Sequence, residues 1–328
     1  MITTPNVKIN LGLNILRKRE DGFHDLETLF VPYFGLHDTL EIIIGDDYSR
    51  TSAAMFAKYG NDTPAKQGSI KPEGVFGVET EDVTAPKIVQ GISEDGKLMI
   101  TIARAEGVDW DPLKDLCAKA YRLLSEDFEL PPVKIFLEKT SPVGAGLGGG
   151  SADAAFTLKM LNELCSLDLT EQQLAGYASK LGSDCAFFIY NRPMIGEGRG
   201  EILTEIATAL PSLAMTFSSD GISVPAQDAF SEGMSLQYEI QVITPAGISV
   251  STAEAYGGIT PAVPEVSLRE ALARPVEEWD GVVVNDFETT VFAKHPELAA
   301  IKRSLYDSGA VYSSMSGSGS ALFAIYRK

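Results

Sequence analysis

The stretch Pro142-Val143-Gly144-Ala145-Gly146-Leu147-Gly148-Gly149-Gly150-Ser151-Ala152-Asp153 is the most informative part of this sequence. Five of the seven residues from 144 to 150 are glycine, between an expected strand at 133–137 and an expected helix at 152–165. Glycine lets the backbone approach a ligand closely because it has no Cβ, and the free N–H groups at a helix start attract anions. The stretch therefore predicts a phosphate-binding turn with Ser151 as the helix N-cap. A flexible linker is the alternative.

Common phosphate-binding and nucleophile motifs do not account for this turn. No Gly-Lys-Ser/Thr sequence closes it, as a P-loop would require. It does not open the first strand–helix unit of the chain, as a dinucleotide-binding fingerprint would, and it lacks the G-x-S-x-G pattern of a nucleophile elbow. The turn is therefore interpreted as a phosphate cradle without the lysine of a P-loop.

Length and composition limit the classes of protein to consider. The 328 residues suggest two domains, and the net charge of −18 disfavours a nucleic-acid partner. No apolar run is long enough to cross a membrane, and residues 1–5 do not resemble a signal peptide. The three cysteines, Cys117, Cys165 and Cys185, are widely spaced, which favours reduced thiols over disulfides or a metal site. No two of the three histidines have the spacing of zinc ligands. We therefore expect a cytoplasmic protein that binds neither nucleic acid nor membrane.

The N-terminal segment alternates apolar and polar residues from Asn6 to Leu16, which predicts a half-buried strand. Lys8 and Asn10 lie on its polar face, which is either an ordinary solvated face or part of a site. An Asp21-Gly22 turn follows and places Phe23 and His24 at the start of the next strand. An aromatic residue beside a histidine at a turn suits stacking on a base together with a hydrogen bond.

The remaining pattern alternates strands with helices. Thr170 followed by Gln173 predicts a capping box, and Asp184 stands in a Gly-Ser turn before an apolar run, either as a helix cap or as a functional carboxylate. Residues 45–96 and 217–237 lack a sustained period and are interpreted as hairpins and loops. Strands are expected at 23–33, 38–44, 97–102, 238–244 and around a second glycine loop at 312–326, and helices at 115–124, 170–181, around 252–256 with Thr252 as the cap, 287–293 and 296–308.

Three features in this order resemble the GHMP kinase family: the Lys8 strand, the loop from Pro142 to Asp153, and the segment Ser314–Ser320. The resemblance implies an α+β, two-domain GHMP kinase fold, with a ribosomal protein S5 domain 2-like N-terminal domain and a ferredoxin-like C-terminal domain. It places an ATP-binding domain at 1–190 and the C-terminal domain at 191–328. Insertions are expected at about 46–96 and 214–237.

Shorter motifs narrow the resemblance to one kind of member of this family. They are Val7–Leu11, Asp21–His24, Leu181–Asp184 and Gly200–Thr204. The member they resemble phosphorylates the 2-hydroxyl of a cytidine-diphosphate sugar alcohol in non-mevalonate isoprenoid biosynthesis. Two alternatives stay open: another small-molecule kinase of mevalonate or homoserine type, and a non-catalytic nucleotide-binding module.

The resemblance also implies roles for particular residues. Asp184 would be the general base for the acceptor hydroxyl, and Lys8 would lie beside it and steady charge near the γ-phosphoryl group. ATP and Mg²⁺ would be the cofactors, with no certain metal ligand and Ser151 as a candidate contact to Mg-ATP. The ATP phosphates would be held by residues Pro142, Gly144, Ala145, Gly146, Leu147, Gly148, Gly149, Gly150 and Ser151.

The acceptor would be held by residues from three other parts of the chain. His24 would hydrogen-bond the cytosine, Phe23 and Tyr256 would sandwich it, and Asn10 would contact the sugar-alcohol end. Gly317 and Gly319 would form the wall opposite the ATP phosphates. A monomer or weak homodimer is expected.

Two positions depart from the family pattern. Phe23 stands where tyrosine is expected, which preserves stacking and removes a hydroxyl. Asp115 stands where an asparagine is expected at the helix lining the adenine pocket.

Overall fold

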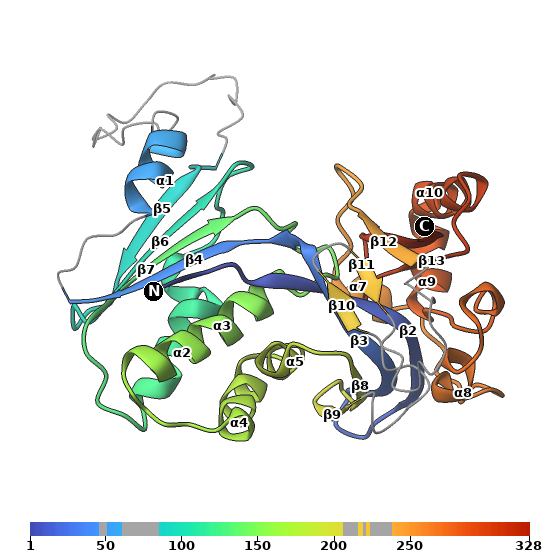
Figure 1. Cartoon of the computed structure of the whole chain (residues 1–328), viewed down its shortest axis with the longest axis horizontal. Coiled ribbons are helices and arrows are strands. Elements are labelled where there is room, and N and C mark those ends of the chain that lie inside the picture. Colours follow the sequence, from blue (N-terminus) through green and yellow to red (C-terminus); the bar gives the residue numbers. More distant parts are fainter. Residues whose placement is uncertain (46–50, 61–84, 206–215, 219–220, 224–237) are drawn as a thin grey trace, which may run out of the picture. The chain divides into compact units, whose positions relative to one another are not determined.

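The computed structural model describes residues 1–45, 51–60, 85–205, 216–218, 221–223 and 238–328. Contacts group the chain into two compact units that are interleaved along the sequence (Figure 1). The first unit consists of 1–4, 38–140 and 157–168, and the second of 5–37, 141–156 and 169–328. Because these units interleave, they do not test the predicted boundary near residue 190, which stays a prediction.

The first unit is built on a five-stranded sheet. Its neighbouring strands are antiparallel except β6 and β7, which run parallel. In sheet order the strands are β1 (Ile2–Thr3), β4 (Thr39–Ile44), β7 (Val133–Lys139), β6 (Leu98–Arg104) and β5 (Ile88–Ile92), and the helices are α1 (Ser52–Tyr59), η2 (Pro112–Lys114), α2 (Leu116–Ser125) and the part of α3 from Thr157 to Leu164.

Helices α1 and α2 cover opposite faces of this sheet (Figure 1). Met55 and Tyr59 of α1 pack on Ile43, Ala103 and Phe136. Helix α1 corrects the expectation that residues 45–96 hold only hairpins and loops. Residues 46–50 and 61–84 of the expected insertion lie outside the described residues.

Asp115 explains where α2 begins. Its carboxylate accepts the Cys117 backbone N–H at 2.9 Å, which caps the helix, and also accepts the Trp110 indole N–H at 3.1 Å. The predicted helix at 115–124 is therefore confirmed with a one-residue shift.

The second unit contains two main sheets and a short hairpin. In sheet order these are the antiparallel β2 (Asn6–Lys18), β3 (His24–His37), β8 (Met194–Gly198) and β9 (Ile202–Glu205); the antiparallel β12 (Tyr238–Ile243), β14 (Leu322–Arg327) and β13 (Tyr312–Met315); and the hairpin β10 (Thr216–Ser218) and β11 (Gly221–Ser223). The rest of the expected insertion at 214–237 lies outside the described residues.

The second unit contains the predicted helices and three further helical segments that the sequence pattern did not predict, at 185–190, 268–272 and 276–278. They are the beginning of α3 (Gly149–Leu164), α4 (Glu171–Leu181), α5 (Cys185–Tyr190), α7 (Thr252–Tyr256), α8 (Leu268–Leu272), η4 (Val276–Glu278), α9 (Phe287–Lys294) and α10 (Pro296–Asp307).

The Thr170–Gln173 capping box of α4 is confirmed. The two cap assignments at Ser151 and Thr252 are wrong. Ser151 lies inside α3, since Gly149 and Gly150 are already helical, and Ser251 caps α7 by accepting the Glu254 N–H at 3.1 Å.

The core of the second unit forms on both sides of β2. Val7, Ile9 and Leu11 pack in one cluster with Trp279 and Phe323, and Leu13 and Ile15 belong to a second cluster. The predicted strand is confirmed, but it is not half-buried: β2 is buried on both faces from Asn6 to Ile15, and its pairing with β3 shifts register between Leu11 and Leu13. Its polar residues Lys8, Asn10 and Asn14 are 3%, 2% and 4% exposed, so the solvated-face alternative is wrong.

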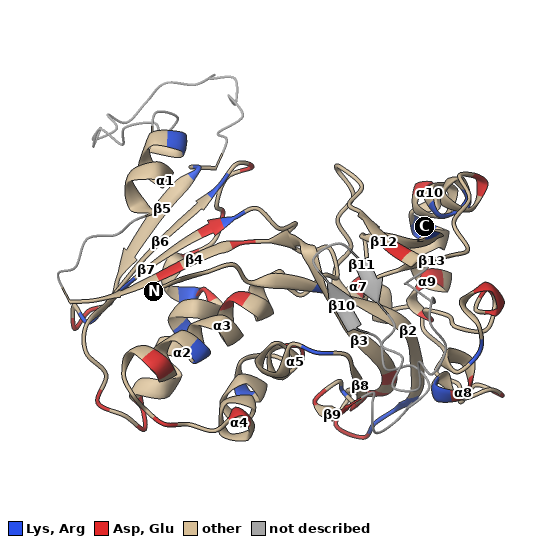
Figure 2. Cartoon of the chain, in the orientation of Figure 1, with Lys and Arg blue, Asp and Glu red and all other residues tan. Residues whose placement is uncertain are grey.

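Acidic and basic residues are interspersed along both units (Figure 2). Within the described residues, no helix has the length and apolar composition needed to cross a membrane.

A buried ion pair in the first unit gives a test of the fold. Lys139 donates to Asp38, which also accepts the Thr140 backbone N–H at 2.7 Å, and both side chains are at least 95% buried. Replacing Asp38 with Ala leaves Lys139 without this partner, so we expect a loss of about 3–5 kcal/mol in the free energy of unfolding. Urea denaturation monitored by circular dichroism measures the loss.

The matched control is Lys58→Ala in the same unit, which breaks the Lys58–Glu138 pair. The Lys58 side chain is 59% exposed, so its loss should cost less than about 1 kcal/mol. Equal effects of the two substitutions would contradict the assignment of Asp38 as a structural residue.

Candidate active site

The central glycine loop turns sharply before α3. Gly144, Gly146 and Gly148 all have left-handed backbone conformations, with φ of +72°, +76° and +71°. A Cβ at Gly146 would lie 2.2 Å from the carbonyl oxygen of Ser316 in the second glycine loop. Glycine is thus required at Gly146 by both the backbone angle and the close approach of two loops.

The side chains of Ala145 and Leu147, between these glycines, anchor the loop in the hydrophobic core. The Leu147 carbonyl accepts the Lys8 backbone N–H at 2.9 Å, and the Ala145 carbonyl accepts the Ala321 N–H at 3.1 Å. The loop is therefore held by β2 on one side and by the second glycine loop on the other.

Lys8 lies at the centre of this arrangement. Its ammonium donates to the Gly146 carbonyl at 2.8 Å and to Asn10 Oδ1 at 2.5 Å, and it lies 3.4 Å from Asp184 Oδ2. Burial lowers the pKa of Lys8, and the neighbouring Asp184 opposes that shift. Lys8, which is distant from the glycine loop in the sequence, thus supplies the cation that the loop itself lacks.

Asp184 occupies the position before α5, but its carboxylate makes no capping hydrogen bond to that helix. Its side chain is 27% exposed, whereas Lys8 is 3% exposed. The helix-cap alternative therefore does not explain this residue. The carboxylate faces Lys8 and stays accessible to a ligand.

A cavity of about 490 Å³ joins these groups, and we call it the Lys8 cavity. Of the residues expected to bind ligands, its lining includes Lys8, Asn10, Gly144, Gly146, Gly148, Ser151, Asp184, Tyr256 and Gly317. Asn10 is buried and its amide donates to Thr28 at 3.0 Å while accepting from Lys8. Gly319 instead packs against Met315, whose sulfur would lie 2.7 Å from an added Cβ.

A second cavity of about 580 Å³ holds the expected base-binding residues Phe23, His24 and Tyr256, and we call it the Phe23 cavity. The rings of His24 and Tyr256 are stacked, with centroids 4.8 Å apart and an angle of 23°. Phe23 is 54% exposed and carries the Arg199 guanidinium over its ring at 4.9 Å. The predicted sandwich of Phe23 and Tyr256 around a base stays a prediction.

Cys185 has no role as a nucleophile in this site. It is completely buried beside Asp184, and burial raises the pKa of its thiol to about 12, so the thiol stays protonated at neutral pH. Cys185 therefore adds no nucleophile to the Lys8 cavity, whose charged lining residues are Lys8, Asp184 and Arg199.

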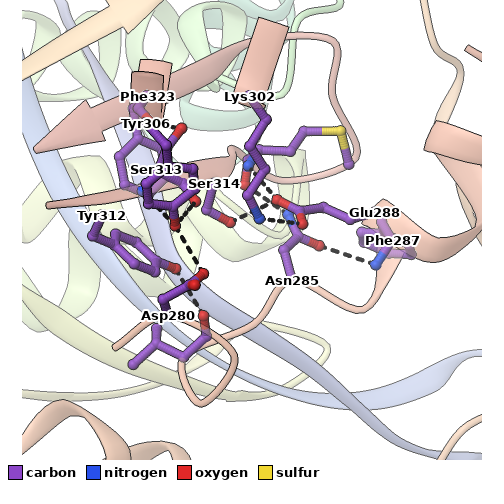
Figure 3. Close-up of polar contacts among 12 residues, drawn as sticks. Asp280, Asn285, Phe287, Glu288, Lys302, Tyr306, Tyr312, Ser313, Ser314 and Phe323 are labelled. Carbon is purple, nitrogen blue, oxygen red and sulfur yellow. Dashed lines mark hydrogen bonds and ion pairs between the residues drawn. The ribbon is translucent and has the colours of Figure 1, made fainter. Parts of the chain in front are cut away.

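Figure 3 shows a polar cluster that sequence reasoning missed. Asn285, 3% exposed, donates its side-chain amide to the carbonyls of Met315 and Gly317 at 2.7 and 2.8 Å. Glu288 accepts from the Ser314 hydroxyl and the Met315 N–H, and pairs with Lys302 at 2.6 Å. These contacts hold the second glycine loop in place at residues 314, 315 and 317.

The cluster extends to the centre of the site through Ser316. The Ser316 hydroxyl donates to the Gly146 carbonyl at 3.1 Å and accepts the Asn10 backbone N–H at 3.3 Å. The only signal in the sequence is the polar sequence Asn285-Asp286 before the expected helix. It gave no indication of what Asn285 contacts.

Comparison with known proteins agrees with this geometry. Residues 115–192 match the model of the GHMP kinases N terminal domain, and residues 268–328 match that of GHMP kinases C terminal. A 4-diphosphocytidyl-2-C-methyl-D-erythritol kinase of Bacteroides thetaiotaomicron is 41% identical over 99% of this chain and 92% of its own length. The chain belongs to the GHMP kinase family. The predicted family, its mixed α and β fold and its two-part organisation are thereby confirmed.

Other relatives support the same assignment. A protein of that name from Parabacteroides distasonis is 37% identical over all of this chain and 92% of its own length. A solved 4-(cytidine 5'-diphospho)-2C-methyl-D-erythritol kinase has a TM-score of 0.62 at 26% identity, covering 99% of this chain and 89% of that one. A solved homoserine kinase from Cytophaga hutchinsonii shares the fold, with a TM-score of 0.58 at 15% identity. The match covers 99% of this chain and 84% of that one. As a member of this family, the chain is an enzyme that uses ATP to phosphorylate a small molecule.

The Asn285 contacts lead to a local prediction. Asn285→Ala removes two hydrogen bonds to buried carbonyls. The free energy of unfolding should fall by about 1–3 kcal/mol, and the second glycine loop should become more mobile. Hydrogen exchange measured by mass spectrometry should become faster in peptides covering 312–321. Gln241→Ala removes an exposed amide from β12 and should leave that exchange unchanged; unchanged exchange in Asn285→Ala would contradict the role given to Asn285.

Proposed function

We propose that this chain transfers the γ-phosphoryl group of ATP to the 2-hydroxyl of 4-diphosphocytidyl-2-C-methyl-D-erythritol, a step in non-mevalonate isoprenoid precursor biosynthesis. The observation that carries the chemical part is the Lys8–Asp184 pair, 3.4 Å apart in a cavity walled by the glycine loop. The relative that is 41% identical supports the choice of acceptor. A non-catalytic binding module would have no need of an accessible carboxylate beside a buried ammonium.

Asp184 is the group proposed to take the proton from the acceptor hydroxyl. Its carboxylate is 27% exposed and makes no capping bond, so it can accept a hydrogen bond from a hydroxyl entering the Lys8 cavity. Lys8 is anchored through Gly146 and Asn10 and holds positive charge where negative charge gathers during phosphoryl transfer. The main work of the site is to position the reactants and neutralise charge.

Mg²⁺ is proposed to enter as part of Mg-ATP. The Lys8 cavity supplies the oxygen donors that Mg²⁺ prefers, the Ser151 hydroxyl and the Asp184 carboxylate. Among the described residues, no three His, Cys, Asp or Glu side chains cluster as metal ligands. When bound, Mg²⁺ would neutralise charge on those phosphates. The roles of the glycine-loop residues in holding them remain part of this proposal.

The Phe23 cavity is proposed to hold the cytosine, with Phe23 and Tyr256 stacking on it and His24 hydrogen-bonding it. This requires the base to replace or extend the present His24–Tyr256 stack. Asn10 would reach the methylerythritol end through the Lys8 cavity. Gly317 is proposed as part of the cavity wall, and Gly319 as support for it.

We further propose a monomer or weak homodimer that works in the cytoplasm. Cys117, Cys165 and Cys185 form no disulfide with one another, which suits a reducing compartment.

Replacing Asp184 with Asn tests the assignment of the base. The amide keeps the shape of the carboxylate but cannot take a proton, so kcat should fall roughly 10²–10⁴-fold. The measurement is ADP release with 4-diphosphocytidyl-2-C-methyl-D-erythritol, with substrate affinity followed by calorimetry. Asp307→Asn, an exposed carboxylate at the end of α10, serves as control. An Asp184→Asn enzyme with wild-type kcat would exclude Asp184 as the base.

Phe23→Ala tests the stacking assignment. Loss of one stacking face should cost about 1–3 kcal/mol of binding, which raises KM for the cytidyl substrate roughly 5- to 150-fold and leaves KM for ATP unchanged. Phe23→Tyr keeps the ring and should behave like the wild type. If KM for the cytidyl substrate does not change in Phe23→Ala, the base does not stack on this residue.

A further inference from the structure

Arg199 stands on the turn between β8 and β9, and the turn fixes where it points. The glycines on either side have left-handed φ values of +70° at Gly198 and +104° at Gly200. The Arg199 backbone N–H donates to the Glu201 carboxylate at 2.5 Å, and the guanidinium Nε lies 3.6 Å from the same carboxylate. The turn is therefore a defined structure rather than a loose loop.

The guanidinium itself lies over the face of Phe23, with 4.9 Å between its central carbon and the ring centroid. A guanidinium stacked on an aromatic ring keeps its edge N–H groups available for an anion, and its planar fork suits phosphate oxygens. The side chain is 46% exposed. The guanidinium N–H groups of Arg199 therefore remain available to a ligand, because its ion pair with Glu201 is not buried.

Arg199 also lies where the two cavities of the second unit meet. The Phe23 cavity and the Lys8 cavity share the lining residues Gly182, Ser183, Arg199, Thr252 and Tyr256. Arg199 is the one charged residue among these five. Its side chain therefore lies within reach of a ligand that occupies both cavities.

The other two cations of the cavities are placed differently. Lys8 lines the Lys8 cavity and is bound to Gly146, Asn10 and Asp184. Lys180 lines the Phe23 cavity alone, and its ammonium lies over the ring of Tyr177 at 5.0 Å. In a chain with a net charge of −18, an anionic ligand needs local positive charge at the place where its own charge lies.

We propose that Arg199 binds the diphosphate of the nucleoside diphosphate substrate. The inference rests on the proposed function, which places a base beside Phe23 and the reacting hydroxyl beside Asp184. The diphosphate connects these two ends and therefore crosses the junction of the cavities. Arg199 is a binding residue there, and its stacking on Phe23 couples recognition of the diphosphate to recognition of the base.

The competing explanation is that Arg199 forms only a surface ion pair with Glu201. The β8–β9 hairpin carries three carboxylates, at Glu197, Glu201 and Glu205, and Glu201 contacts this arginine. An arginine that only balances these charges would not change the affinity of a phosphate-bearing ligand relative to one without phosphate.

The experiment compares cytidine and cytidine 5'-diphosphate as ligands of the purified full chain by isothermal titration calorimetry. The wild type should bind the diphosphate more tightly than cytidine. Arg199→Gln should reduce this preference about tenfold, the loss of a charge-assisted contact at a partly exposed site, while the affinity for cytidine stays unchanged. Arg199→Lys should restore part of the preference because it keeps the charge and loses the fork.

Lys180→Gln is the matched control, since it removes a cation that lines only the Phe23 cavity. Its preference for the diphosphate should equal that of the wild type. Arg199 is excluded as the diphosphate ligand if Arg199→Gln keeps the full preference, or if Lys180→Gln loses it instead. A wild type that binds cytidine 5'-diphosphate but transfers no phosphate to the cytidyl substrate would contradict the proposed function and leave the Arg199 result standing by itself.

Discussion

The burial of one ammonium group governs the structure of this active site. Lys8 lies on a strand that is buried on both faces, and its charge is stabilised by a carbonyl, an amide oxygen and a carboxylate. A buried charge without such partners would be strongly unfavourable. The glycine loop, Asn10 and Asp184 therefore have to converge on this point, and their convergence forms the cavity where the chemistry is proposed to occur.

The two glycine loops depend on each other for the same reason. Gly146 approaches Ser316 so closely that a Cβ would lie 2.2 Å from its carbonyl oxygen. The Gly146 carbonyl in turn accepts hydrogen bonds from Lys8 and from the Ser316 hydroxyl. Asn285 fixes the far side of the second loop, so residues separated by more than a hundred positions hold one carbonyl in place. A precise site of this kind is what phosphoryl transfer by positioning requires.

Local patterns in the sequence predicted much of this fold. Alternation predicted β2, and the Thr170–Gln173 pair predicted the start of α4, because both are local properties of the chain. The helix start at Gly149 was missed because a glycine run favours a turn in isolation, whereas here packing keeps Gly149 and Gly150 helical. The resemblance to the family brought Lys8 and Asp184 together before the structure did. Alternation alone could not distinguish a polar face in water from one turned into a site.

Arg199 and Asn285 were outside the reach of sequence reasoning. Each acts through contacts with residues distant in the chain, Phe23 for one and Met315 and Gly317 for the other. The Gly-Arg-Gly sequence at 198–200 predicts only a loop. A single asparagine gives no repeating pattern from which its burial or its contacts could be predicted. Such residues are found through the cavities and hydrogen bonds that the folded chain creates.

The most direct measurement is ³¹P NMR of the reaction of the purified chain with ATP, Mg²⁺ and an equal mixture of 4-diphosphocytidyl-2-C-methyl-D-erythritol, mevalonate and homoserine. The account predicts one new phosphomonoester signal, on the 2-position of the cytidyl compound, formed one-for-one with ADP. Phosphorylation of mevalonate or homoserine in its place, or no phosphorylated product at all, would contradict it.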